Sequence, residues 1–378
     1  MEVVAAGCQD YEPKLAIEKV REALTKLQVE QLVTRGDTVL LKPNLLSPHP
    51  PQAGITTHPV VVEAVIRYFQ ELGAEVKVGE SSGGMMVNQS LTEQAFQKTG
   101  VLAVCQKLGV EVINFDRIST EIVSSDEYDF PLPQILLEAD LVVSLPKLKT
   151  HSLTLFTGAI KNLYGCIPGM KKVEYHRSCP HPVDFSELIV DIFELVKPDL
   201  AVMDGIVGLE GNGPGATGDT CQVGVILAAQ DLVALDTVAA SYLGYTENQV
   251  PITRIAAERG LGSNNLQQIK IVGNFQPSQR EYRLPSNALL SLLPNWLLEP
   301  LFGSLLSQPV INQQECIECQ RCVESCPQDV IVDREGLEIE EKDCIKCLCC
   351  QELCPQEAIT VREHQLVRLM RSIKEFLS

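Results

Sequence analysis

The 378-residue sequence has few basic residues and nothing that resembles a leader peptide. Lysine and arginine number 31 against 49 aspartates and glutamates, a formal net charge of −18. This balance argues against nonspecific binding to nucleic acid, which depends on Lys and Arg. The first ten residues, MEVVAAGCQD, lack the basic start and the long apolar core of a signal peptide. We therefore expect a cytoplasmic protein, in a compartment that keeps its thiols reduced.

Long uninterrupted apolar runs are also missing. The most apolar stretch, residues 288–306, contains the only tryptophan and is broken by two prolines, an asparagine and a glutamate. A membrane-spanning helix needs roughly 18 to 20 consecutive apolar residues. We expect residues 286–311 to be an apolar linker packed between two domains, with membrane-surface or partner contact through 288–306 as the less favoured alternative. The final residues, 364–378, place leucines at helical intervals and predict a docked C-terminal helix.

Complete nucleotide-binding motifs are absent. The glycine-rich stretches GESSGG (79–84) and GLEGNGPGATG (208–218) lack the spacing of a dinucleotide fingerprint, and neither is a Walker sequence. No flavin or nicotinamide motif is evident. A phosphate or nucleotide role is therefore the minority interpretation, and the glycines are expected mainly to permit turns.

What the sequence does have is cysteine at regular spacing near its end. CIECQRCVESCP (316–327) and CIKCLCCQELCP (344–355) each place three cysteines at two-residue gaps and a fourth after three more residues, before a proline. In bacterial ferredoxins with this spacing, three thiolates hold one [4Fe–4S] cube and the fourth reaches the other cube. The spacing predicts two clusters, one held by Cys316, Cys319, Cys322 and Cys354 and the other by Cys344, Cys347, Cys350 and Cys326.

Zinc sites and disulfides are weaker interpretations of these cysteines. Zinc rarely takes four thiolates from one run, twice in one chain, and disulfides need an oxidising compartment. Cys349 falls outside both sets. We expect it to be a spare small side chain, with a slipped ligation as the alternative.

Residues 312–363 resemble the two-cluster bacterial ferredoxin module. Each half consists of a cysteine run, a proline and a short apolar strand, DVIVD in the first and EAITV in the second, repeated after about 28 residues. The resemblance implies a small α+β domain whose clusters lie close enough to exchange electrons. Its acidic composition suits docking on a basic patch of a redox partner protein.

Residues 1–285 alternate between apolar strand-like runs and helical stretches. Runs such as DTVLLKPNL, AEVKVGE, ADLVVSLPKL and VGVILAAQD predict strands, and HPVVVEAVIRYFQELG and SELIVDIFELVK predict helices. Alternation of this kind indicates an α/β fold with a largely parallel sheet and helices on both faces. In such sheets, ligands bind at the carboxyl ends of the strands.

Polar side chains follow several of the predicted strands. We expect them to meet at one rim of the sheet, although a single strand-end lysine is more often a solvated charge. A further pair lies within TGAIKNLYGCIPG, where the flanking glycines suggest a close backbone approach and a Lys–Asn pair suits a carboxylate or a carbonyl. The candidate substrate residues are Lys42, Asn44, Lys147, Lys149, His151, Lys161, Asn162, Asp204 and Glu210.

The segments LLKPNLL, GAEVKVGESSGG, PKLKTH, TGAIKNLYG and DGIVGLEGNGPGATG occur in the order typical of one family, across residues 38–240. On these segments the chain resembles the family called domain of unknown function 362, in its form fused to a ferredoxin tail. The resemblance implies the α/β fold and the clusters but no settled reaction.

Three hypotheses about function remain open. In the first, the clusters pass low-potential electrons to an anionic or carbonyl molecule at the rim, with Asp204 or Glu210 relaying a proton. In the second, the protein is an electron carrier whose α/β domain docks partners. In the third, the clusters are structural and the α/β domain binds or isomerises a small acid.

Overall fold

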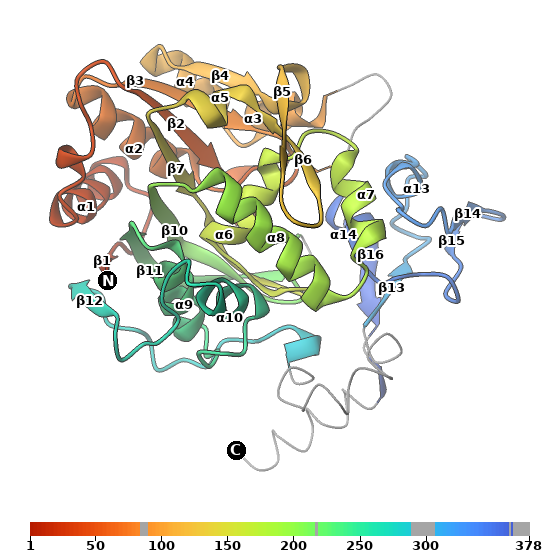
Figure 1. The fold of residues 1–378 in the computed structure, drawn as a ribbon. Coiled ribbons are helices and arrows are strands. Elements are labelled where there is room, and N and C mark those ends of the chain that lie inside the picture. Colours follow the sequence, from red (N-terminus) through yellow and green to blue (C-terminus); the bar gives the residue numbers. More distant parts are fainter. Residues whose placement is uncertain (84–89, 216–217, 289–306, 363, 366–378) are drawn as a thin grey trace.

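The computed structural model describes residues 1–83, 90–215, 218–288, 307–362 and 364–365. Figure 1 shows a large α/β domain, formed by the described residues up to 288, and a small cluster module, residues 307–362, beside helix α7 (Lys171–Ser178). Almost all of the apolar segment 288–306 and of the predicted C-terminal helix lies outside the described residues, so both remain predictions. No described helix is long and apolar enough to cross a membrane.

A mostly parallel sheet forms the centre of the α/β domain. Among the described residues it contains ten strands, and its paired strands run parallel except for β1 with β11, β10 with β11, and β8 with β9. A separate hairpin joins β5 (Thr120–Ser124) to β6 (Asp129–Pro133). The main path of the sheet runs through β12 (Lys270–Gly273), β1 (Glu2–Gly7), β11 (Gly218–Ala229), β10 (Leu200–Gly211), β7 (Leu141–Leu145), β2 (Thr38–Pro43), β3 (Glu75–Glu80) and β4 (Glu111–Asn114), while β8 (Lys147–His151) pairs with β10 and with β9 (Leu155–Thr157).

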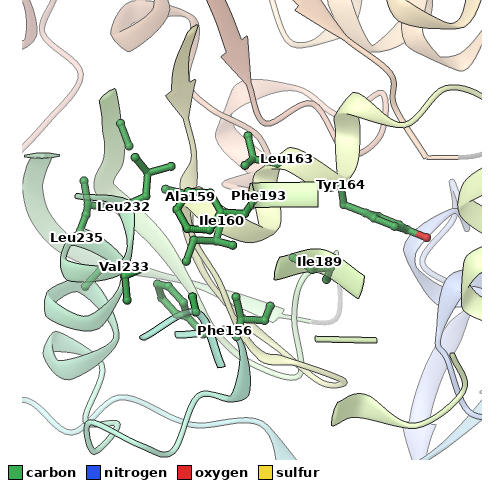
Figure 2. Packing of buried hydrophobic residues seen from close by; sticks show 14 of the residues in the cluster. Phe156, Ala159, Ile160, Leu163, Tyr164, Ile189, Phe193, Leu232, Val233 and Leu235 are labelled. Carbon is green, nitrogen blue, oxygen red and sulfur yellow. The ribbon is translucent and has the colours of Figure 1, made fainter. Parts of the chain in front are cut away.

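Helices cover both faces of this sheet, because alternate strand residues point to opposite faces. In β2, Leu40 belongs to one buried apolar cluster and Val39 and Leu41 belong to another. Figure 2 shows part of the first cluster, around α6 and α9. The predicted α/β fold with helices on both faces is confirmed. The first cluster is covered by α6 (Ala159–Asn162), α8 (Pro182–Val196), α9 (Leu232–Tyr242) and α10 (Pro251–Glu258), and the second by α1 (Pro13–Lys26), α2 (Pro59–Glu71), α3 (Leu91–Lys98) and α4 (Val101–Leu108), with the short α5 (Gln134–Glu138) following β6.

Local sequence signals set the ends of these helices. Helices α1 and α2 begin with proline, whose missing N–H costs no hydrogen bond in a first turn. The side chains of Glu12 and His58 accept hydrogen bonds from the N–H groups of Leu15 and Val60 and so cap the two helices. Helix α4 ends at Leu108 and is capped by Gly109, which adopts the left-handed conformation that glycine tolerates.

The cluster module consists of two copies of one unit, as its sequence repeat predicts. Helix α14 (Cys349–Glu352) lies 28 positions after α13 (Arg321–Glu324). The left-handed backbone at Glu318, Gln320 and Asp329 recurs 28 positions later in the chain, at Lys346, Leu348 and Glu357. Two short antiparallel pairs complete the module, β13 (Gln308–Ile311) with β16 (Ile359–Arg362) and β14 (Ile331–Asp333) with β15 (Leu337–Ile339).

Candidate functional site

A cavity of about 90 Å³ lies between the α/β domain and the cluster module, and we call it the interdomain cavity. Its floor includes the ends of β2 and β3, so it opens at the carboxyl edge of parallel strands, where α/β proteins commonly bind ligands. Helix α14 and the residue after it contribute Cys349, Glu352 and Leu353 to the wall. The polar side chains from the α/β domain are Lys42, Asn44, Glu80, Ser81, Lys149, Thr157, Lys161, Asn162, Tyr164, Lys172 and His176.

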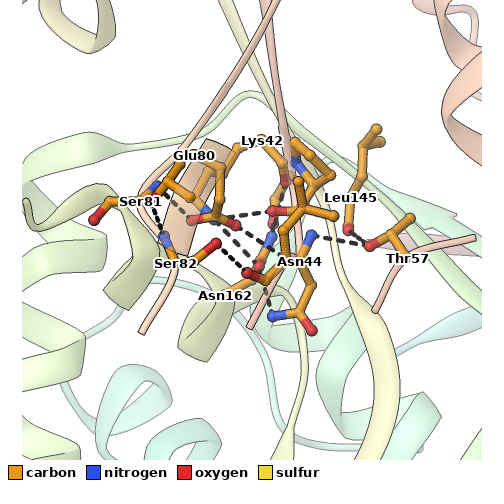
Figure 3. A network of polar contacts seen from close by, with 12 residues as sticks. Lys42, Asn44, Thr57, Glu80, Ser81, Ser82, Leu145 and Asn162 are labelled. Atoms are coloured by element: carbon orange, nitrogen blue, oxygen red, sulfur yellow. Dashed lines mark hydrogen bonds and ion pairs between the residues drawn. The ribbon is translucent and has the colours of Figure 1, made fainter. Parts of the chain in front are cut away.

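Lys42 is fully buried in one wall of the cavity (Figure 3). Its Nζ lies 2.8 Å from Oε2 of Glu80 and donates further hydrogen bonds to the carbonyl oxygen of Pro43 and to Oδ1 of Asn162. Burial raises the pKa of Glu80, although the Lys42 ammonium opposes that shift. An ammonium has three N–H donors, so all three hydrogen bonds of Lys42 are made within the protein. Its role is therefore to stabilise the wall.

Lys172 is satisfied in the same way. Its Nζ donates to the carbonyl oxygen and hydroxyl of Ser81, both at 2.6 Å, and to the carbonyl oxygen of Ser82 at 2.9 Å. Burial lowers its pKa to about 8. These three bonds tie helix α7 to the turn after β3.

Lys149 and Lys161 keep donors that the protein does not use. Nζ of Lys149 donates to Oδ1 of Asn44 at 2.7 Å and to the carbonyl oxygen of Ile55 at 2.8 Å, which leaves one N–H. Burial, together with the nearby Lys161 charge, lowers the pKa of Lys149 to about 7. Within the described part of the chain, the Lys161 ammonium makes no hydrogen bond or close ion pair. Burial also lowers the pKa of Lys161. The cavity therefore contains two amines with unused donors, and that of Lys149 titrates near neutral pH.

Two further polar atoms in the wall are buried without a hydrogen-bond partner among the described residues, Oγ1 of Thr157 and Nδ1 of His176. The ring of His176 stacks on Phe185 with centroids 4.2 Å apart. Burial lowers the pKa of His176 to about 3, so this imidazole is neutral at pH 7. Unpaired buried polar atoms are rare in native proteins, and their gathering in one cavity marks it as a ligand site.

Glu352 links the cluster module to the α/β domain. Its Oε1 lies 3.4 Å from Nε2 of His151, without hydrogen-bond geometry. Burial alone would raise the pKa of Glu352, but His151 and the Lys161 ammonium outweigh this effect and lower the pKa. On the outside of the interface, Arg177 donates to the carbonyl oxygen of Pro327 and pairs with Asp329.

The glycines of TGAIKNLYG permit close approach to carboxylates of the protein itself. A Cβ on Gly165 would lie 2.2 Å from Oε1 of Glu80, and a Cβ on Gly158 would lie 2.1 Å from Oδ1 of Asp236. The Asp236 carboxylate accepts the N–H groups of Ala159 and Ile160 at the start of α6. Gly158 thus permits the contact that caps α6, the helix that carries Lys161, and Gly165 leaves room for the Lys42–Glu80 pair.

The structure brings together five of the nine predicted substrate residues, Lys42, Asn44, Lys149, Lys161 and Asn162, in the interdomain cavity. His151 lies behind the wall, next to Glu352. The other three residues lie elsewhere. Lys147 is buried in a pair with Asp204, 2.7 Å apart, and Glu210 pairs with Arg280 and Arg283.

Sequence reasoning did not select several other residues of the wall, among them Thr157, Lys172, Cys349 and Glu352. Thr157 directly precedes the GAIKN segment, so this motif could have been used to predict it. Cys349 and Glu352 belong to the cluster module, and no pattern in the sequence indicates that the module faces this rim.

The cysteines of the module gather around two smaller cavities. Apolar side chains supply most of each remaining lining, and Cys349 lines neither of them. Among the described residues, no three potential ligands converge as they would around a single metal ion, whereas a cube spreads its ligands over several corners. Cys316, Cys319, Cys322 and Cys354 line one cavity, and Cys326, Cys344, Cys347 and Cys350 line the other.

Comparisons with known proteins find a family match for the α/β domain and another for the cluster module. Residues 39–241 match the family described as Domain of unknown function (DUF362), and residues 308–355 match a 4Fe-4S dicluster domain. The chain is therefore an iron–sulfur protein. It is 34% identical over 259 residues to the thylakoid-associated protein sll1697 of Synechocystis sp., a match that covers 68% of this chain and 78% of that protein.

Two solved structures are similar to part of the chain. One is a protein from Thermotoga maritima (TM-score 0.32, 16% identity, 52% of this chain) and the other is the lactate racemase apoprotein from Thermoanaerobacterium thermosaccharolyticum (TM-score 0.36, 13% identity, 53% of this chain). The match spans 51% and 50% of the length of these two chains.

Proposed function

The chain belongs to the DUF362 family, and from this premise we propose that it is an iron–sulfur oxidoreductase that reduces a small anionic or carbonyl molecule in the interdomain cavity. The observation that carries the proposal is the shared wall of that cavity. Helix α14 presents Cys349 and Glu352 to the cavity, while Cys347 and Cys350, on either side of Cys349, line a cysteine-lined cavity of the module. A molecule bound beside Lys161 would therefore lie next to the predicted ligands of one cluster.

The two sets of four cysteines fit two [4Fe–4S] clusters, because each set surrounds its own cavity with thiol donors and an apolar remainder. Clusters bound there would supply single electrons at low potential. A redox partner protein, or a chemical reductant in vitro, would reload them, and the acidic module suits docking on a basic partner surface. A reducing compartment such as the cytoplasm suits this chemistry.

The reduction balances with two electrons and two protons. For a carbonyl acceptor, the C=O π bond is lost, one C–H bond and one O–H bond form, and the two clusters contribute one electron each. Lys161 would hold the anionic end of the acceptor as an ammonium without an internal partner. Lys149 would supply one of the protons, because its pKa lies at about 7 and one of its N–H groups is unused. Solvent water would supply the other proton.

The first test is a cluster reoxidation screen. The holoprotein is purified anaerobically, reduced chemically and mixed with fractionated pools of cell metabolites while its visible absorbance is followed. Wild type is compared with Lys161→Ala and with Lys171→Ala, since Lys171 is an exposed lysine of α7 outside the cavity.

We expect one pool to reoxidise wild type and Lys171→Ala but to act far more slowly on Lys161→Ala. Equal reoxidation of all three proteins, or reoxidation only by partner proteins, would instead indicate an electron carrier.

A further inference from the structure

We propose that the molecule bound in the interdomain cavity is a small 2-oxo monocarboxylate, rather than a phosphate ester or a dicarboxylate. This inference rests on the proposed function, since it names the substrate class of the same cavity. It follows from four properties of the wall: the unused donors, the balance of charge, the occupied backbone N–H groups and the size of the space.

The unused donors define the shape of the recognised group. Lys161 offers a cation with no internal hydrogen bond in the described chain, and Thr157 offers a buried hydroxyl without a partner. Thr157 lies opposite Lys149 in the β8–β9 register and four positions before Lys161, so the three donors stand around one part of the wall. A carboxylate accepts several such hydrogen bonds at once.

A second polar group on the ligand is needed to satisfy His176. Its neutral ring comes from α7, and its Nδ1 has no partner among the described residues. A carbonyl oxygen next to the carboxylate would accept a hydrogen bond from this ring when Nδ1 carries the proton. We therefore infer that the ligand carries a second acceptor group besides its carboxylate.

The charge of the wall favours a single negative charge. Lys42 is paired with Glu80, and Lys172 is bonded to three oxygens of Ser81 and Ser82. Lys161 has no ion-pair partner within the described chain, and the Glu352 carboxylate lies in the same wall. A second carboxylate on the ligand would be repelled by Glu352, which is not paired with a described lysine as Glu80 is.

Phosphate is disfavoured because the turn after β3 has no backbone N–H to spare among its described residues. The N–H groups of Ser81, Ser82 and Gly83 donate to the carbonyl oxygen of Gly165, to Oγ1 of Thr92 and to the carbonyl oxygen of Leu46. Phosphate sites on such turns depend on free backbone N–H groups. The described N–H groups of this turn are therefore used within the protein and are not available to a phosphate.

The size of the cavity agrees with a small acid. A volume of about 90 Å³ corresponds to about six to nine water-sized positions, at roughly 10–15 Å³ for each. A three- or four-carbon 2-oxo acid occupies a similar number of positions.

The test is calorimetric titration of the oxidised holoprotein with pyruvate, 2-oxoglutarate and inorganic phosphate, without any reductant. Pyruvate is expected to bind at least about tenfold more tightly than the other two. Loss of a hydrogen bond to a charged group weakens binding by about tenfold or more. Lys161→Met and Thr157→Val should each show such a loss for pyruvate, while Lys171→Met should bind like wild type.

Phosphate or 2-oxoglutarate binding as tightly as pyruvate would overturn the inference, as would no heat of binding with pyruvate or unchanged affinity in Lys161→Met. Because the titration involves no electron transfer, its result is separate from that of the reoxidation screen. Pyruvate binding without reoxidation would refute the reductase, whereas reoxidation by another compound without pyruvate binding would refute only the substrate class.

Discussion

The α/β domain and the cluster module are stabilised in different ways. The α/β domain buries two large apolar clusters on the two faces of its sheet, and it satisfies charges such as Lys42 within its own wall. The module has a buried core of five residues, two of which are cysteines. A core of that size rarely holds a domain together without metal or cross-links. We therefore expect the domain to build its half of the cavity alone and the module to need bound iron–sulfur to present α14.

Loss of metal should produce the largest difference between the two regions, because only the module is expected to depend on it. Cys350→Ala removes a predicted ligand, whereas the neighbouring Cys349→Ala removes a thiol that lines neither cysteine-lined cavity. We expect Cys350→Ala to lose iron and to lose hydrogen-exchange protection in β13 and β16, because metal binding and folding are coupled in such modules. Protection in β2 and β10 should persist. Equal iron loss in Cys349→Ala would show that the ligand sets are assigned wrongly.

The next largest effect concerns the α/β domain alone. Gly165→Ala would place a methyl group 2.2 Å from Oε1 of Glu80 and 2.6 Å from Nζ of Lys42. Separating a buried ion pair costs about 3–5 kcal/mol, and we expect urea unfolding of the α/β domain to report a loss of that size. Gly7→Ala is the control, since its Cβ would meet nothing closer than 3.5 Å. Similar urea midpoints for Gly165→Ala and Gly7→Ala would refute the close approach of Gly165 to the Lys42–Glu80 pair.

The titration of Lys149 should distinguish the cavity wall from the rest of the domain. Its pKa falls from 10.5 in the unfolded chain to about 7 in the folded protein, so between these values the unfolded state binds more protons. The free energy of unfolding should therefore rise with pH across this window, by up to about 1.4 kcal/mol per pH unit for one proton. Lys149→Met should flatten that slope, measured by urea unfolding at several pH values. An unchanged slope would mean that Lys149 keeps its ordinary pKa.

The smallest effect is expected at the outer edge of the interface. Nη2 of Arg177 lies 3.1 Å from Oδ2 of Asp329, and the two side chains are 54% and 82% exposed. Exposed ion pairs contribute about 0–1 kcal/mol, so Asp329→Asn should change the thermal midpoint of the module only slightly. A large loss would show that docking depends on this pair more than on the buried contacts of Glu352.

Much of the fold could be predicted from the sequence because its signals are local. The alternation of apolar strands and helices predicts the sheet, and the 28-residue repeat predicts the two copies in the module. The hairpin of β5 and β6 and the antiparallel strand β11 were not predicted as such, because strand direction depends on pairing with distant residues.

The candidate site was predicted only in part, for a similar reason. Lys42 and Asn44 could be predicted because the carboxyl ends of parallel strands share one edge. Lys149 lies within β8, and Lys161 and Asn162 lie on α6, so their prediction depended on the PKLKTH and TGAIKNLYG segments instead. Lys147 and Asp204 follow the same pattern but pair with each other, and no spacing in the sequence reveals which lysine will find an internal partner. The contribution of Glu352 depends on how the module docks, which is a long-range property.

The most direct test of the account compares two routes out of the reduced clusters. Reduced wild type and Lys161→Ala are mixed rapidly with ferricyanide and, separately, with the acceptor found in the reoxidation screen. We expect the two proteins to react at equal rates with ferricyanide, which needs no binding cavity, and Lys161→Ala to react about tenfold or more slowly with the acceptor. If Lys161→Ala reacted as fast as wild type with the acceptor as well as with ferricyanide, the claim that electrons leave through the interdomain cavity would be contradicted.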